Sequence, residues 1–356
     1  MPSCQVCGAN VQEFLDLGQQ PLSDRFRTPE ETGPEFFYRL AVGVCPDCTM
    51  VQLTEQVPQD LMFGEEYPYY SSGSSVMREH FEGTARRFLA GPLSADPFIV
   101  EIGSNDGVLL RTVRDAGVRH LGVEPSGGVA EVARQAGVRV RTEYFDAKTA
   151  ADIHATDGPA DVIFAANTIC HIPYLPSILE GVATLLGPDG IFVFEDPYLG
   201  DIVAKTSFDQ IYDEHFYLFT ARSVRAAARR SGLELVDVER LPVHGGEVRY
   251  TLARAGSREP SAAVDALIAE EAAGRLADPA TLHAFAANIL RIRADLVALL
   301  ERLRDEGRTV AAYGATAKSA TVTNFCGIGP DLISYCLLYT SPSPRDQRGS
   351  RMPSSA

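Results

Sequence analysis

Apolar and polar residues alternate in short blocks between residues 98 and 199, and these blocks predict a regular succession of strands and helices. Strands are predicted at 98–103, 120–125, 138–145, 160–172 and 191–199. Helices are predicted between them, at 108–117, 127–137 and 176–190. This order is typical of a parallel sheet with helices on both faces. We therefore predict a doubly wound, Rossmann-like α/β domain.

The same kind of pattern predicts elements on both sides of this domain. They are a helix over 76–89, a helix that starts after a Thr220 cap and ends near Gly232, strands over 234–241 and 247–254, a helix over 278–306, and a strand, glycine turn and helix over 309–320. The last group indicates the start of a second, smaller α/β domain.

Composition and charge exclude several classes of protein. Of the 356 residues, 45% are hydrophobic and 22% charged, as in globular proteins. The net charge is -15 and the basic residues form no long run, so duplex nucleic acid is not an expected partner. No apolar run reaches the ~18 residues of a membrane span, and the first ten residues lack the features of a secretory signal. We expect a cytoplasmic monomer that does not associate with membranes.

Four of the seven cysteines form two CxxC pairs, Cys4 with Cys7 and Cys45 with Cys48. Two thiolates at this spacing can bind one metal ion, and two such pairs complete a tetrahedral zinc site with no open position. We predict a structural zinc ion, with the intervening segment folding back as a hairpin. Unrelated buried cysteines are the less favoured alternative. Cys170 and Cys326 have no partner spacing and are interpreted as core thiols.

A glycine-containing loop follows the first strand of the predicted sheet, with the sequence EIGSNDG over 101–107. Its spacing is GxxxG rather than the GxGxxG of dinucleotide-binding proteins, which favours S-adenosylmethionine over NAD. Acidic and amide side chains end the next strands, where they can face a cofactor. The predicted cofactor-binding residues are Glu101, Gly103, Asn105, Asp106, Gly107, Glu124 and Asn167. The alternative is that these residues form an ordinary turn and bind no cofactor.

Candidate reactive side chains follow the fourth and fifth strands. His171 lies just after the fourth strand, and YDEHFY over 212–217 lies in the loop after the fifth. A histidine beside a glutamate can act as a general base near neutral pH. A structural role at a strand end is the alternative for each histidine. The loop that contains Tyr67, Tyr69 and Tyr70 could close over the same edge.

These motifs, taken in order, resemble those of the zinc-containing sugar C-methyltransferases that act on nucleotide-linked ketosugars. The motifs are CxxCG, LGxQPLSDRF, CPDCxxVQL, EYPYYSSGSS, EIGSNDG, ANTICHIP, YDEHFYLF, HGGEVRY and YGATAKSATVTN. The resemblance extends over nearly the whole chain up to Tyr335.

The resemblance implies methyl transfer from S-adenosylmethionine to C-3 of a TDP-linked 4-keto-6-deoxysugar through an enolate. Tyr212, Glu214 and His215 match the family's YxEH motif, with His215 as the favoured base. His171 matches a second histidine of the site, and either Tyr69 or Tyr70 matches a tyrosine before the two serines. The glycine turn of the C-terminal domain is expected to hold the nucleotide diphosphate through Gly314, Ala315, Thr316, Ala317 and Lys318.

Three other functions remain open from the residues alone. They are O- or N-methylation of another small metabolite, cofactor binding by an inactive zinc protein, and an NAD-dependent reaction on a sugar, which the glycine spacing disfavours.

The predicted domains are a zinc-binding module with a substrate-covering loop over 1–75, the methyltransferase domain over 76–256, a helical linker and the start of a nucleotide-binding α/β domain over 257–335, and a tail over 336–356. The tail is rich in proline and serine and has no apolar periodicity. It resembles translated adaptor or vector sequence, so we expect it to be non-native and to truncate the C-terminal domain.

Overall fold

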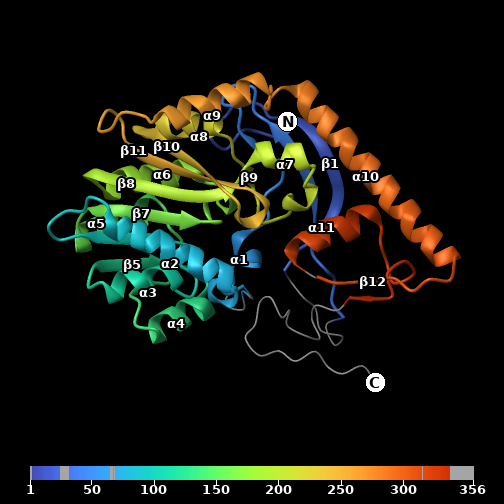
Figure 1. Cartoon of the computed structure of the whole chain (residues 1–356), viewed down its shortest axis with the longest axis horizontal. Helices are drawn as coiled ribbons and strands as arrows, with labels where there is room; N and C mark the ends of the chain where they lie inside the picture. Colours follow the sequence, from blue (N-terminus) through green and yellow to red (C-terminus); the bar gives the residue numbers. More distant parts are fainter. Residues whose placement is uncertain (1, 25–31, 65–66, 68, 315, 337–356) are drawn as a thin grey trace.

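The computed structural model describes residues 2–24, 32–64, 67, 69–314 and 316–336. Its largest sheet has seven strands in the order β10-β11-β8-β7-β4-β5-β6 (Figure 1). These strands are β4 (Phe98–Ile102), β5 (Arg119–Val123), β6 (Val140–Arg141), β7 (Ala160–Ala166), β8 (Leu186–Pro197), β10 (Leu233–Leu241) and β11 (Glu247–Arg254). The pairs from β8 to β6 are parallel, whereas β11 is antiparallel to both its neighbours. The prediction of a doubly wound α/β domain is confirmed, with one antiparallel strand in the sheet.

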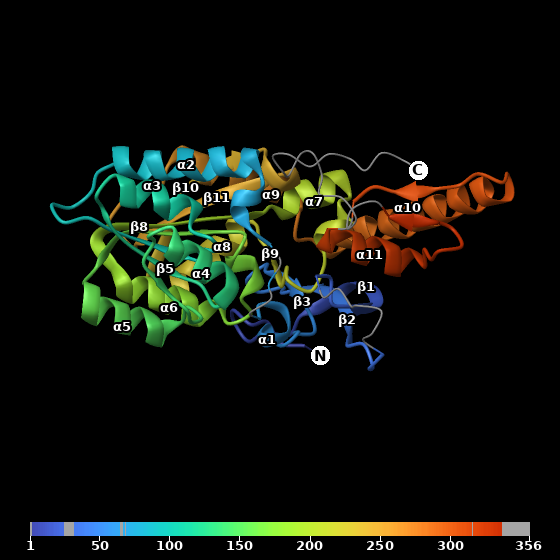
Figure 2. The same ribbon diagram turned by 90° about the horizontal axis from the view of Figure 1, so that it is seen from below.

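Helices cover both faces of the sheet. They include α2 (Ser75–Ala90), α3 (Val108–Asp115), α4 (Gly127–Gln135), α5 (Ala147–Asp157), α6 (Leu175–Leu185) and α8 (Ala221–Arg230). Figure 2 shows α2 and α3 on one face and α5 and α6 on the other. Because successive strand residues point to opposite faces, Ile99 and Phe164 pack in the core under α2 and α3, and Val100 and Ile163 pack in the core under α5 and α6.

Several predicted boundaries differ from those observed. The helix predicted over 176–190 ends at Leu185, and residues 186–190 belong to β8. Gly187, Pro188 and Gly190 explain this, since proline and glycine disfavour a helix interior. The strand predicted over 138–145 shortens to two residues. Among the described residues, four α-helices were not predicted: α1 (Gln59–Met62), α5, α7 (Leu199–Lys205) and α9 (Ala262–Ala273).

The N-terminal residues form a second, four-stranded sheet with the order β1-β2-β3-β9. Its strands are β1 (Gln12–Pro21), β2 (Phe37–Val44), β3 (Val51–Leu53) and β9 (Tyr217–Leu218). The hairpin predicted between the cysteine pairs is confirmed, because β1 and β2 are antiparallel neighbours. The fourth strand comes from the loop after β8, and the backbone N–H of Leu53 donates to the Phe216 carbonyl at 2.8 Å. The N-terminal sheet is therefore joined to the segment that contains the YDEH motif.

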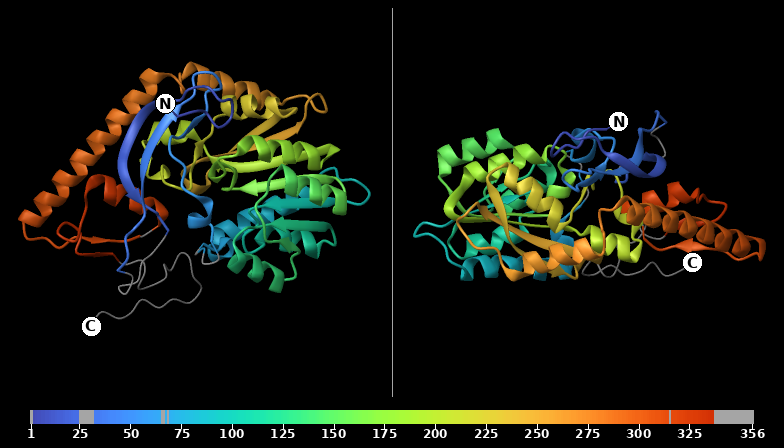
Figure 3. Two further views of the ribbon diagram at one scale, coloured as in Figure 1. Left: turned by 180° about the vertical axis from the view of Figure 1, so that it is seen from behind. Right: turned by 90° about the horizontal axis from the view of Figure 1, so that it is seen from above.

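The C-terminal residues continue with α9, α10 (Pro279–Asp305), β12 (Ala311–Ala312), α11 (Ala317–Cys326) and β13 (Tyr335–Cys336). Asp278 caps α10 by accepting from the backbone N–H of Ala280 at 2.9 Å. The long helix α10 runs alongside the N-terminal sheet (Figure 3). Strand β13 pairs in parallel with β12. Apart from Cys336, the predicted non-native tail lies outside the described residues. Within the described part of the chain, the helices are all too short or too polar to cross a membrane.

Candidate functional site

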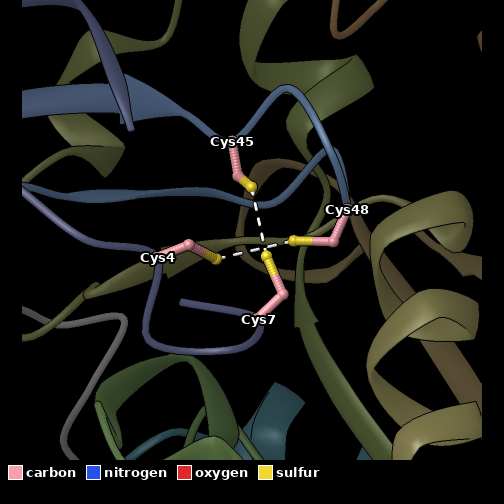
Figure 4. A group of neighbouring side chains, drawn as sticks. All are labelled: Cys4, Cys7, Cys45 and Cys48. Carbon is pink, nitrogen blue, oxygen red and sulfur yellow. Dashed lines mark hydrogen bonds between the residues drawn. The ribbon is translucent and has the colours of Figure 1, made fainter. Parts of the chain in front are cut away.

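The four cysteines of the two CxxC pairs converge on one point (Figure 4). The Sγ atoms of Cys4 and Cys48 are 3.5 Å apart, those of Cys7 and Cys45 are 3.4 Å apart, and all four lie within 4.8 Å of one another. A tetrahedral ion with Zn–S bonds of about 2.3 Å requires sulfurs about 3.8 Å apart, so the arrangement fits zinc. Because all four positions come from the protein, the ion would be structural.

The two cysteine turns have the same backbone conformation. In each, the residue four positions after the first cysteine donates its N–H to that cysteine's carbonyl, Gly8 to Cys4 at 2.8 Å and Thr49 to Cys45 at 3.0 Å. Gly8 and Thr49 both have a positive φ, of 80° and 61°. The repeated turn directs both thiols of each pair toward the same point.

The predicted cofactor loop joins β4 to α3 at the carboxyl edge of the main sheet. Gly103 has a φ of +67°, and a Cβ there would clash with the side chain of Thr168. Gly107 forms the N-cap of α3 with a φ of +77°. Asn105 also has a positive φ, of 48°, which is uncommon outside glycine and typical of functional loops. The loop therefore follows a path that only these small or amide residues allow.

Glu124, at the end of β5, holds this loop in place. Its two carboxylate oxygens accept from the backbone N–H of Asn105 at 2.9 Å and of Ser126 at 2.8 Å. Burial raises the pKa of this carboxyl group. Each oxygen keeps a second lone pair, so Glu124 can accept from ribose hydroxyls as predicted.

Two further acidic side chains of the loop have unpaired oxygens. Within the described part of the chain, Glu101 Oε2 and Asp106 Oδ1 are buried and have no hydrogen-bond partner. Burial raises the pKa of Glu101 well above its usual value. Buried polar atoms are normally paired, so these oxygens fit a ligand with hydrogen-bond donors, such as the ammonium and hydroxyl groups of S-adenosylmethionine.

Replacing Glu124 with Gln should weaken binding of S-adenosylmethionine about tenfold to a hundredfold, because a hydrogen bond to a charged group contributes about 1.5–3 kcal/mol. Isothermal titration calorimetry measures the change. Glu131→Gln, on the exposed face of α4, is the matched control and should bind normally. Equal affinity in Glu124→Gln and Glu131→Gln would exclude Glu124 from the cofactor site.

The aromatic loop before α2 contacts the cofactor loop, as the sequence predicted. The backbone N–H groups of Ser71 and Ser72 donate to Asn105 Oδ1 at 2.9 Å and Asp106 Oδ2 at 3.3 Å. Tyr69 and Tyr70 are 43% and 44% exposed. It is Tyr67 that lies inward, since its hydroxyl hydrogen-bonds Glu214 and its ring contacts Phe63 at 5.5 Å.

His215 is buried in the loop between α7 and β9 with both ring nitrogens hydrogen-bonded. Nδ1 donates to the carbonyl of Gln210 at 2.8 Å, which leaves Nε2 as the acceptor for the Tyr212 hydroxyl at 2.9 Å. Burial, His171 and Lys318 lower the pKa of His215 well below its usual value. The imidazole is therefore neutral at physiological pH, with its basic nitrogen directed at Tyr212.

The second predicted histidine stacks on the first. The rings of His171 and His215 are 5.3 Å apart, and Phe63 stacks on the other face of His171 at 5.6 Å. Burial lowers the pKa of His171 to about 3, so it is also neutral. Among the described residues, its Nε2 has no hydrogen-bond partner. His171 can therefore donate to or accept from a ligand beside the base.

Glu214 is a buried carboxyl group whose pKa is raised well above its usual value by burial, Asp24 and Asp213. The hydrogen bond from Tyr67 opposes this rise only in part. This environment therefore favours the protonated form of Glu214, which can donate a hydrogen bond, as other carboxylic acids in apolar sites do.

Cys170, next to His171, completes a second group of possible metal ligands with the two histidines, all within 4.8 Å of one another. Burial and Asp196 raise the pKa of the Cys170 thiol well above its usual value, which disfavours the thiolate that a metal requires. The interpretation of Cys170 and Cys326 as buried core thiols is confirmed.

The predicted diphosphate loop lies at the start of α11, whose N-cap is Thr316 and whose first residue is Ala317. Gly314 has a φ of 118°, and Ala315 lies outside the described residues. Lys318 lies close enough to His215 and Glu247 to shift their pKa values. Helix α11 also contacts the loop that carries the base, because Thr321 Oγ1 donates to the Ile211 carbonyl at 2.8 Å.

Three acidic or aromatic residues near the base were not singled out from the sequence. Tyr67 was considered only as part of the aromatic loop, and nothing in the pattern separates it from Tyr69. Asp24 lies just after β1 and acts on Glu214 from the N-terminal module. Glu247 begins β11. Its position in the HGGEVRY motif could have marked it as a candidate site residue.

Comparison with known proteins gives matches to three consecutive parts of the chain. A family model described as "Putative zinc binding domain" matches residues 4–63, a "Methyltransferase domain" matches 77–238, and a "C-methyltransferase C-terminal domain" matches 242–353. Among curated proteins, the C-methyltransferase NovU of Streptomyces niveus is 33% identical over 339 residues, which are 94% of this chain and 80% of that protein.

Solved structures resemble only part of the chain. A methyltransferase from Anabaena variabilis is 16% identical, with a TM-score of 0.42, over 53% of this chain and 89% of its own. The CcbJ methyltransferase from Streptomyces caelestis is 16% identical, with a TM-score of 0.39, over 52% of this chain and 99% of its own.

The match to NovU extends over both the cysteine-rich module and the methyltransferase domain, with the C-terminal domain included. S-Adenosylmethionine is accordingly the methyl donor, and the four cysteines form a structural zinc site. The chain belongs to the family of zinc-containing, S-adenosylmethionine-dependent C-methyltransferases that its motifs resemble.

Proposed function

We propose that the chain methylates C-3 of a TDP-linked 4-keto-6-deoxysugar, with His215 as the base that removes the proton from that carbon. One observation carries the proposal. The hydrogen bond from His215 Nδ1 to Gln210 leaves a neutral, basic Nε2 inside an enclosed site, as abstraction of a carbon-bound proton requires. Transfer to oxygen or nitrogen would not require removal of a carbon-bound proton.

The keto group makes the neighbouring C–H acidic. When that bond breaks, its proton goes to Nε2 of His215 and its electron pair delocalises onto the keto oxygen. When bound, S-adenosylmethionine supplies the electrophilic methyl group. The hydrogen bond between Tyr212 and His215 must then reverse, since the protonated Nε2 becomes the donor and the Tyr212 oxygen the acceptor. The hydroxyl hydrogen of Tyr212 becomes free to point at the substrate.

Glu214 is the group best suited to stabilise the enolate oxygen. Its burial and its acidic neighbours favour the protonated form, which can donate a hydrogen bond to developing negative charge. Tyr67 forms a hydrogen bond with Glu214, and the ring of His171 stacks on that of His215. The reaction centre would therefore combine one neutral base with neutral hydrogen-bond donors.

The nucleotide part of the substrate would bind at the start of α11. Backbone N–H groups at a helix N-terminus favour phosphate oxygens, and Lys318 adds a positive charge on the first turn. We further propose that the protein acts as a monomer in the cytoplasm, where reduced thiols remain available to bind zinc.

The test is incubation of the protein with S-adenosylmethionine and TDP-4-keto-6-deoxyglucose, followed by mass spectrometry and proton NMR of the product. One added methyl group on C-3 would support the proposal in full. Because the keto group also acidifies C-5, a methyl group there would keep the enolate mechanism and correct the position. A methyl group on oxygen, or no turnover by protein that binds the methyl donor, would refute the proposal.

A further inference from the structure

Glu247 is a buried acidic residue for which the proposed reaction has no use. It is the first residue of β11 and lies opposite Pro197 at the end of β8. Because β11 runs antiparallel to β8, its amino end lies at the carboxyl edge of the parallel strands. Glu247 therefore shares this edge with Asn167, at the end of β7, and with the loop that carries His215.

The carboxyl group of Glu247 lacks the partners that a buried charge normally has. The residue is 0% exposed, and within the described part of the chain neither Oε1 nor Oε2 has a hydrogen-bond partner of normal geometry. The side chain of Asn167 interacts with this carboxyl group and favours its ionised form. Unpaired buried carboxylates are rare because desolvation of the charge is costly.

Glu195, on the neighbouring strand, is a buried carboxylate in similar surroundings that does have hydrogen-bond partners. It is also buried, and it pairs with Arg249 at 2.6 Å and with His80 at 2.6 Å. Glu195 therefore has two positively charged or hydrogen-bonding partners within the chain, whereas no comparable ion pair is formed by Glu247 among the described residues. A purely structural requirement does not explain this difference.

The charged groups around Glu247 come from three elements. Burial and Glu195 on β8 raise its pKa to about 7, while His80 on α2 and Lys318 on α11 oppose the rise. Among the described residues, Lys318 forms no ion pair within 4.0 Å, and it also acts on His215. An acid and an ammonium group that act on each other therefore lie at the same edge of the sheet as the base.

We propose that Glu247 binds the sugar ring of the substrate by accepting hydrogen bonds from a hydroxyl or amino substituent. This inference rests on the proposed function. Two free carboxylate oxygens suit a group with several O–H or N–H donors, which a hydroxylated or aminated sugar has and the sulfonium centre of the methyl donor lacks. Tyr212, Glu214 and His215 are similarly enclosed, at 7%, 4% and 3% exposed.

The test uses Glu247→Gln, which keeps the shape and removes the charge. The KM for TDP-4-keto-6-deoxyglucose should rise about tenfold to a hundredfold, as expected for losing hydrogen bonds to a charged acceptor. The dissociation constant of S-adenosylmethionine should not change. The melting temperature should stay equal or rise, because glutamine can keep the contact with Asn167 through its amide oxygen and removes a buried charge.

Glu271→Gln is the matched control. Glu271 is also buried, but its oxygens accept from the backbone N–H groups of Ala221 at 2.7 Å and Arg222 at 3.0 Å. Losing one of these bonds should lower the melting temperature and leave the KM unchanged. The two variants thus separate substrate binding from the general effect of neutralising a buried carboxyl group.

Proton release gives a second measurement that does not depend on turnover. Hydrogen bonds from the sugar favour ionised Glu247, so its pKa should fall from about 7 when the ketosugar binds. Calorimetry at pH 7 in two buffers of different ionisation enthalpy should detect a released proton for the wild type and none for Glu247→Gln.

Each outcome has one meaning. An unchanged KM and unchanged proton release in Glu247→Gln, with an active wild type, would overturn the role of Glu247 and leave the proposed function intact. Weakened binding of S-adenosylmethionine alone would also overturn it and would assign the residue to the methyl donor. A wild type that neither binds nor methylates the ketosugar would refute the proposed function and this inference together.

Discussion

His215→Asn should lower kcat for C-methylation by about 10²–10⁴-fold, the usual contribution of a positioned general base. Asparagine can occupy the site and form hydrogen bonds, but it cannot take a proton from carbon. Binding of S-adenosylmethionine should be unchanged, because His215 lies in the loop between α7 and β9 and the predicted cofactor residues follow β4, β5 and β7. Single-turnover assays with TDP-4-keto-6-deoxyglucose measure the chemical step directly.

Isotope exchange separates proton removal from methyl transfer. In D₂O without methyl donor, the wild type should exchange the C-3 hydrogen of the ketosugar, and His215→Asn should not. His154→Asn is the matched control, since His154 lies exposed on α5, and it should behave as the wild type. Full exchange by His215→Asn would assign the base to another residue, with His171 as the next candidate.

The pH dependence of the wild type follows from the same geometry. Burial, His171 and Lys318 hold the pKa of His215 well below its usual value, so the base stays deprotonated down to acidic pH. No loss of activity from protonation of this base is therefore expected as the pH falls through 6.5.

Cys48→Ser should remove stoichiometric zinc and destabilise the whole protein. Structural zinc in small domains contributes about 10–16 kcal/mol, or about 2.5–4 kcal/mol for each of four thiolates, against a typical total stability of about 5–15 kcal/mol. Activity should fall as well, because Cys48 lies just before β3, which pairs with β9 directly after His215. Elemental analysis, urea unfolding and kcat measure the three effects.

Cys326→Ser provides the comparison for loss of a buried thiol. Cys326 ends α11, outside the two cysteine turns. It should retain zinc and most activity. A Cys48→Ser protein with full zinc content and wild-type stability would contradict the four-cysteine site.

The parts of the molecule that could be predicted are those with local signals. The main strands were found because β4, β7 and much of β8 are buried on both faces and are therefore continuously apolar. The zinc site was found because ligand spacing is itself a local pattern. The cofactor loop was found because Gly103 and Gly107 mark a backbone path that other residues could not follow.

The parts that could not be predicted depend on contacts distant in sequence. Strand β9 has two residues, and it is a strand only because Gln52 and Val51 of the N-terminal module pair with it. Glu247 was missed because the direction of β11 cannot be read from its own residues, and a parallel strand would have placed it at the opposite edge. Tyr67 turns inward because Ser71 and Ser72 fix the end of its loop on Asn105 and Asp106.

The loop that carries the base is fastened at three places to three different parts of the chain. Strand β9 pairs with the N-terminal sheet, Ile211 accepts from Thr321 of α11, and the Gln210 amide donates to the His244 carbonyl at 2.9 Å beside β11. This constrains the engineering of hybrid enzymes. A chimera could take its C-terminal, nucleotide-binding part from a relative in order to accept a different nucleotide sugar as substrate. It would have to keep a hydroxyl group at the position of Thr321, because loss of the hydrogen bond to Ile211 would displace the loop that carries the base.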